Sequence, residues 1–95
     1  MNIKKLLTKK NLRTWLESKK PQARVGEVAQ TTACPIFKFL TENKVAVEEV
    51  TWIDAYIANE FVVLPKWTTD FIKKVDELPT ATVSAKKALE ILETV

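Results

Sequence analysis

The sequence predicts an α+β domain in which a small, mostly antiparallel sheet is covered by about four helices. Apolar residues near both ends of the chain recur at helical spacing, residues in the middle alternate as strands do, and four prolines separate the segments. Runs of short strands separated by tight turns favour antiparallel pairing. A chain of 95 residues suffices for one domain with one core, so residues 1–95 are expected to form a single unit with a basic N-terminal segment, residues 1–24.

The first helix is expected to begin after Thr8 and to end before Pro21. Thr8 can cap the first turn, and Leu7 can pack on Leu12 across it. Leu12 and Trp15 then share one apolar face. The N-terminal third of the chain therefore begins with an amphipathic helix.

A short strand over residues 23–28 and a second helix are predicted next. The strand holds Gly26, which indicates a bulge or a close approach of another backbone segment. The helix begins near Cys34 and Pro35, because proline is accepted in a first helical turn. Asn43 is expected to end this helix in a left-handed conformation.

Residues 45–64 admit two interpretations. The favoured one is a β-hairpin that turns near residues 58–60, with residues 61–64 as its second strand. The other is a short helix, in which Thr51 and Asp54 would form a capping box. Short apolar runs fit both structures, so both remain open at this stage.

Two helices are predicted at the C-terminal end. The first runs over about residues 65–78 and is stopped by Pro79, and Ser84 caps the second. A strand (residues 23–28), a central hairpin and about four helices make up the expected domain.

The aromatic residues divide into expected core and expected surface. Trp15 and Trp67 lie on apolar helix faces and Trp52 is in phase with Val50, so all three tryptophans are expected mostly in the core. Tyr56 is the aromatic residue most readily placed at the surface, where it could contact a partner.

The composition argues against catalysis. The chain has no His, one Cys and one Gly, so it lacks an imidazole base, a Cys-rich metal site and a Gly-rich phosphate loop. Cys34 at a helix start could favour its thiolate, but without a neighbouring His it is expected to be a packing residue. No catalytic residue, cofactor or metal ligand is predicted, and the chain is not expected to be an enzyme.

Charge is unevenly distributed along the chain. Residues 1–24 carry eight basic groups and one acidic group, a net +7, and residues 25–95 carry seven basic and eleven acidic groups, a net −4. Such a basic end either indicates an anionic partner or is attracted by the acidic remainder of the same chain. The candidate patch for an anion or nucleic acid consists of Lys4, Lys5, Lys9, Lys10, Arg13, Lys20 and Arg24.

A segment of about 16 residues partly resembles a helix-turn-helix motif. Its opening, residues 25–29, is similar to the first helix of that motif in bacterial repressors. The helix that would read bases exposes mainly Lys38, Thr41, Glu42 and Lys44, and no Arg, Gln or Asn lies near its start. Sequence-specific DNA recognition is therefore not expected, whereas non-specific contact with phosphates stays open.

Spaced elements over most of the chain resemble small uncharacterised proteins of bacterial and phage type. These elements are Cys34-Pro35-Ile36 with Leu40, and Leu64-Pro65-Lys66-Trp67 with Phe71 and Val75-Asp76. The resemblance implies a protein from a bacterium or its mobile elements, and it implies no activity.

These observations favour a non-catalytic interaction module that binds a protein partner or self-associates. The alternative is a nucleic-acid-binding protein that uses the basic N-terminal stripe. A cytoplasmic location without a membrane partner is expected, because no apolar run reaches the length of a signal peptide core or a membrane span. The lone Cys fits a reducing compartment.

Overall fold

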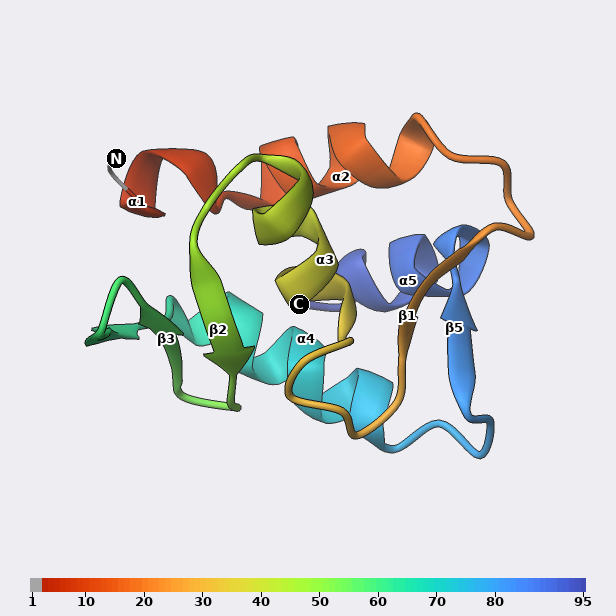
Figure 1. The fold of residues 1–95 in the computed structure, drawn as a ribbon. Helices are drawn as coiled ribbons and strands as arrows, with labels where there is room; N and C mark the ends of the chain where they lie inside the picture. The colour runs from red at the N-terminus through yellow and green to blue at the C-terminus, as the bar shows by residue number, and fades with distance from the viewer. Residues whose placement is uncertain (1–2) are drawn as a thin grey trace.

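Helices and strands are interspersed along the chain in the computed structural model, which describes residues 3–95 and confirms the α+β class (Figure 1). The helices lie toward the centre of the molecule, and the strands lie on either side of them, at two separate places. The elements are α1 (Ile3–Leu6), α2 (Lys9–Glu17), β1 (Arg24–Glu27), α3 (Pro35–Glu42), β2 (Val47–Val50), β3 (Asp54–Ile57), β4 (Glu60–Val63), α4 (Lys66–Asp76), β5 (Thr82–Ser84) and α5 (Ala85–Leu92).

The strands form two antiparallel sheets rather than the one sheet that the sequence predicts. β2, β3 and β4 form a three-stranded meander in chain order. β1 does not join it but pairs with β5, a strand that the sequence analysis missed. β5 has three residues, too few to show an alternating pattern, so only the pairing with β1 reveals it.

Gly26 shows both of the features that its place in a strand predicts. The β1–β5 register shifts between Arg24 and Gly26, which is the bulge. The start of α3 crosses Gly26 so closely that a Cβ atom there would lie 2.6 Å from the backbone nitrogen of Pro35. Only a residue without a side chain allows this contact.

The two predicted N-caps are confirmed, and Cys34 supplies a third N-cap that the sequence does not predict. The Thr8 Oγ1 atom accepts a hydrogen bond from the Asn11 amide at 3.1 Å, and Ser84 caps α5 in the same way. Cys34 caps α3, where its Sγ accepts from the Phe37 amide at 3.4 Å. These caps satisfy amides that have no partner within their own helix.

The predicted end of α2 is wrong, whereas Asn43 does end α3 but without the left-handed conformation predicted for it. α2 ends at Glu17 instead of running up to Pro21. Asn43 has a φ of −91°, and the left-handed residue after α3 is Lys44, with a φ of 63°. The Asn43 side chain instead donates to the Phe39 carbonyl at 2.8 Å, so it satisfies the helix end without a left-handed backbone.

The hairpin turn predicted near residues 58–60 is confirmed, but the central segment forms three strands rather than two, because a further turn separates β2 from β3. Ala58 and Asn59 join β3 to β4, and both have a positive φ, as a two-residue type I′ turn requires. The Thr51–Asp54 pair serves a different purpose from a helix cap. The Thr51 Oγ1 atom accepts from the Asp54 amide at 3.1 Å and donates to the Asp54 Oδ1 atom at 2.8 Å, which closes the turn between β2 and β3.

The main core lies between the helices and is built from their apolar faces. Phe71, Leu12, Leu16 and Leu40 are fully buried in it. Thr68, on the inner face of α4, is also fully buried, and its hydroxyl has no hydrogen-bond partner among residues 3–95. A buried polar group without a partner keeps the cost of its desolvation.

Substituting Gly26→Ala should destabilise the fold by about 1–3 kcal/mol, because the added methyl group overlaps the backbone of Pro35. Urea unfolding followed by circular dichroism measures the change. Gly26→Ala combined with Pro35→Ala should recover part of the loss, since the Pro35 Cδ atom is one of the atoms in the overlap. An unchanged unfolding midpoint in the single variant would contradict the close contact.

Replacing Thr68 by Val should raise the free energy of unfolding by about 1 kcal/mol, because the isosteric change removes a buried hydroxyl without a partner. Thr68→Ser is the matched control: it keeps the hydroxyl, removes a methyl group and should lower stability. Thermal unfolding of the three proteins tests this. A Val variant less stable than wild type would show that the hydroxyl is bonded.

Candidate functional site

The exposed large apolar side chains of residues 3–95 all come from one segment of the chain. Trp52, Ile53, Phe61 and Val63 are 50%, 64%, 65% and 72% exposed. The prediction that Trp52 lies in the core is wrong: Trp52 sits in the turn after β2, where the strand alternation that placed it beside Val50 has ended. Trp15 and Trp67, in contrast, are partly buried against the core.

Strand register explains why Phe61 and Val63 are exposed. Tyr56 lies opposite Phe61 and Asp54 lies opposite Val63, so these four residues share one face of the β3–β4 hairpin. Ala55 and its neighbours on the other face point to the core, where Ala55 is fully buried. The rings of Tyr56 and Phe61 touch, with their centroids 4.8 Å apart.

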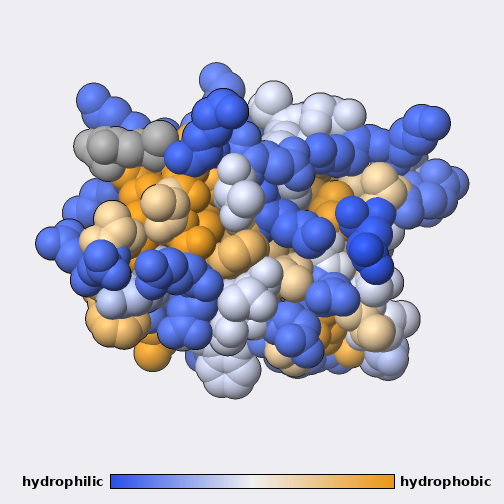
Figure 2. Space-filling model, in the orientation of Figure 1, coloured by the Kyte–Doolittle hydropathy of each residue, from blue (hydrophilic) through white to orange (hydrophobic). Residues whose placement is uncertain are grey.

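We call Trp52, Ile53, Tyr56, Phe61 and Val63 the hairpin surface. Figure 2 shows apolar atoms at the molecular surface over the β2–β3 end of the molecule, bordered by hydrophilic side chains. Apolar patches with polar borders mark sites of contact with other macromolecules. Tyr56, which the sequence predicts at the surface, is half-buried among these residues.

Trp52 is exposed but firmly held. Its indole Nε1 donates to the Asp76 Oδ2 atom at 2.6 Å, and the other oxygen of Asp76 accepts from the Ala29 amide at 2.9 Å. The ammonium group of Lys73 lies 5.4 Å from the centre of the Trp52 ring, a cation–π contact. Two side chains of α4 therefore contact this ring, and the Ala29 amide holds one of them, Asp76, in place.

A surface pocket of about 270 Å³ lies beside Trp52. The neutral polar side chains in its lining are those of Gln30, Thr31 and Thr51. The carboxylate in its lining, Asp76, already accepts two hydrogen bonds. Cys34, also in its lining, is only 3% exposed, and burial raises the pKa of its thiol from 9.0 to about 11. Residues 3–95 contain no group of three or more Cys, Asp or Glu side chains placed to hold a metal ion. The two ionisable side chains of the pocket are therefore a protonated thiol and a carboxylate whose oxygens already accept hydrogen bonds.

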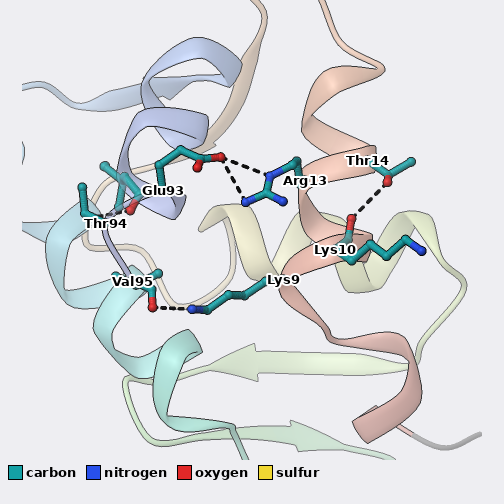
Figure 3. A network of polar contacts seen from close by, with 8 residues as sticks. Lys9, Lys10, Arg13, Thr14, Glu93, Thr94 and Val95 are labelled. Carbon is teal, nitrogen blue, oxygen red and sulfur yellow. Dashed lines mark hydrogen bonds and ion pairs between the residues drawn. The ribbon is translucent and has the colours of Figure 1, made fainter.

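The predicted basic patch is divided in the structure. Lys9 donates to a main-chain oxygen of Val95, and Arg13 forms an ion pair with Glu93 at 3.0 Å (Figure 3). Both side chains extend from α2 toward the end of α5, so they tie the two helices together. The remaining members of the patch are exposed: Lys4, Lys5, Lys10, Lys20 and Arg24.

A second basic contact joins α2 to α3. The Glu42 carboxylate accepts from the Trp15 indole at 3.0 Å and from the Lys19 ammonium at 2.9 Å. These two donors lower the pKa of Glu42 below its ordinary value. Attraction between the basic first helix and the rest of the chain, one of the two interpretations of the charge distribution, therefore occurs at specific pairs.

The hairpin surface lies in the most acidic part of the chain. Residues 46–64 contain four carboxylates, Glu48, Glu49, Asp54 and Glu60, and neither Lys nor Arg. Sequence reasoning grouped these carboxylates with the whole of residues 25–95 and so missed their concentration. Counting charge by predicted element would have found it. Among residues 3–95 no helix combines the length and apolar character needed to cross a lipid bilayer.

Cys34 should react about a hundredfold more slowly with a maleimide in the native protein than in the urea-unfolded chain at pH 8. A rise in pKa of about two units lowers the thiolate fraction by this factor, and burial adds to it. Mass spectrometry of timed samples measures the rate. Equal rates in the two states would contradict the buried, protonated thiol.

Comparison with known proteins gives this chain no relative: no family model, no curated protein and no solved structure matches it.

Proposed function

We propose that the protein is a non-catalytic interaction module that binds another protein through the hairpin surface. The observation that carries this proposal is that, among residues 3–95, the exposed large apolar side chains all lie within residues 52–63. Covering them would remove apolar area from water, which is the main favourable contribution to most protein association. Aromatic residues such as Trp52, Tyr56 and Phe61 are also the types that contribute most to binding energy at interfaces.

The rigidity of this surface supports the same proposal. Trp52 is fixed by Asp76 and Lys73, and Tyr56 and Phe61 fix one another across two paired strands. Side chains that are already ordered lose less conformational entropy on binding. An apolar surface exposed on a preorganised hairpin is therefore favourable for association.

The charge contacts favour a protein partner over a nucleic acid. Lys9 and Arg13, the central members of the predicted basic stripe, are engaged by Val95 and Glu93. Residues 46–64, which contain the hairpin surface, carry four carboxylates and neither Lys nor Arg, and this charge disfavours contact with phosphates. The exposed cations Lys10, Lys20 and Arg24 lie outside β3 and β4, and Lys73, whose ammonium lies 5.4 Å from the centre of the Trp52 ring, belongs to α4.

The double variant Phe61→Ser with Val63→Ser should reduce association at least tenfold while leaving the fold intact, because both side chains are mostly exposed. Light scattering measures self-association. Incubating the immobilised protein with a cell extract, followed by cross-linking, measures the binding of other proteins. Lys86→Ser with Lys87→Ser, which changes two exposed residues of α5, is the matched control and should behave as wild type.

Two results would overturn this proposal. The first is a strictly monomeric protein that retains no other protein, or that retains the same proteins when Phe61 and Val63 are replaced. The second is a salt-sensitive gel shift with DNA or RNA that Lys10→Glu and Lys20→Glu abolish. Those two lysines are the appropriate probes because they are exposed, whereas Lys9 and Arg13 hold α2 against α5.

A further inference from the structure

β4 is an edge strand: within residues 3–95 no second strand pairs with its outer side. The sheet order β2-β3-β4 leaves β4 paired with β3 alone. An unpaired edge presents a row of main-chain N–H and C=O groups that can pair with another strand. In β4 only alternate residues direct these groups to the open edge.

The hairpin geometry identifies these residues as Phe61 and Val63. A two-residue turn is closed by a hydrogen-bonded pair, here Ile57 with Glu60, and hydrogen-bonded pairs then occur at every second position. The Leu64 amide donates to the Ile53 carbonyl at 2.8 Å, which continues this alternation beyond β4. The N–H and C=O groups of Phe61 and Val63 therefore point away from β3, toward the open edge. Outside the sheet, neither residue forms a main-chain hydrogen bond within residues 3–95.

The same two residues carry the most exposed apolar side chains of the hairpin surface. Phe61 is 65% and Val63 is 72% exposed. A strand added beside β4 would thus gain main-chain hydrogen bonds and apolar side-chain contacts from the same residues. Strand addition obtains affinity from the first and specificity from the second.

Charge selects the kind of strand that fits. Glu60 begins β4 and its side chain lies on the face opposite to Phe61 and Val63. When the apolar residues of an added strand face Phe61 and Val63, its alternate residues lie on the Glu60 face. With four carboxylates and no cation in residues 46–64, an incoming strand with Lys or Arg is attracted and an acidic strand is repelled. A second copy of β4 would place Glu60 and its neighbouring carboxylates beside an equally acidic sheet.

We propose that β4 accepts an additional strand from a partner protein, an extended segment in which apolar residues are interleaved with Lys or Arg. This inference rests on the proposed function and specifies the partner of the hairpin surface. Phe61 and Val63 supply the main-chain groups and the apolar contacts on one face of the added strand, and Glu60, whose side chain lies on the opposite face of β4, supplies the charge preference on the other face.

A synthetic peptide of sequence Lys-Val-Arg-Val-Lys-Val-Arg is the probe, and nuclear magnetic resonance of the labelled protein is the readout. The amides of Phe61 and Val63 should shift and exchange with solvent more slowly when the peptide binds. A matched peptide with Glu in place of Lys and Arg should bind at least tenfold more weakly. Two further peptides carry N-methyl groups on alternate backbone nitrogens, one on the odd-numbered and one on the even-numbered residues. One of them loses the N–H groups that face β4, and that peptide should bind at least tenfold more weakly than the unmethylated peptide.

The variant Val63→Pro tests the edge from the protein side. Proline removes an N–H that points outward, so the β3–β4 ladder keeps its hydrogen bonds while the edge loses a donor. Peptide affinity should fall at least tenfold, and Val63→Ala, which keeps the N–H group, should lose less. If Val63→Pro does not fold, the methylated peptides give the same information on the unchanged protein.

Three outcomes would overturn the inference: equal binding of the basic and acidic peptides, unchanged affinity of both methylated peptides, or a homodimer that forms through β4. One result would contradict strand addition without contradicting the proposed function. In that result, partner binding is lost in the variant Phe61→Ser with Val63→Ser but is kept in Val63→Pro and with the methylated peptides. In that case the side chains bind without the edge, and the proposed function stands. If neither the peptide nor any protein depends on Phe61 and Val63, both proposals fail.

Discussion

The close crossing at Gly26 is the constraint on which the arrangement of the helices and both sheets depends. Here the backbone of β1 touches the first turn of α3, with room for a hydrogen atom but not for a methyl group. The contact fixes where α3 begins, and the cap at Cys34 stabilises the same point from within the helix. α3 leads through residues 43–46 into β2, and the Val50 amide donates to the Thr31 carbonyl at 2.8 Å. The Gly26 contact and this hydrogen bond therefore both contribute to the position of the acidic sheet relative to the β1–β5 pair.

Elements with strong local signals could be predicted from the sequence, and elements defined by distant partners could not. Thr8, Ser84 and the prolines act on their own neighbourhoods, so the helix starts and the hairpin were found. β5 exists because β1 lies beside it, and no property of three residues reveals that. The local Thr51–Asp54 pattern was real, but its hydrogen bonds close a strand turn as readily as they cap a helix.

The candidate site shows the same division. Tyr56 was expected near a partner surface, but the larger exposed residues around it were not, because alternation alone does not tell which face of a strand is covered. The exposure of Trp52 results from a carboxylate 24 positions later in the chain that fixes the ring at the surface. Likewise, the sequence presents the basic stripe as available to an anion, but in the structure residues at the end of α5 engage Lys9 and Arg13.

The two sheets differ in how much of the chain must be assembled before they form. β2, β3 and β4 are consecutive and joined by short turns, so their pairing closes only small loops. β1 and β5 join residues 24–27 to residues 82–84, so their pairing closes a loop that contains more than half of the chain. The topology therefore gives the acidic meander short-range contacts and gives the β1–β5 pair the larger entropic cost of loop closure.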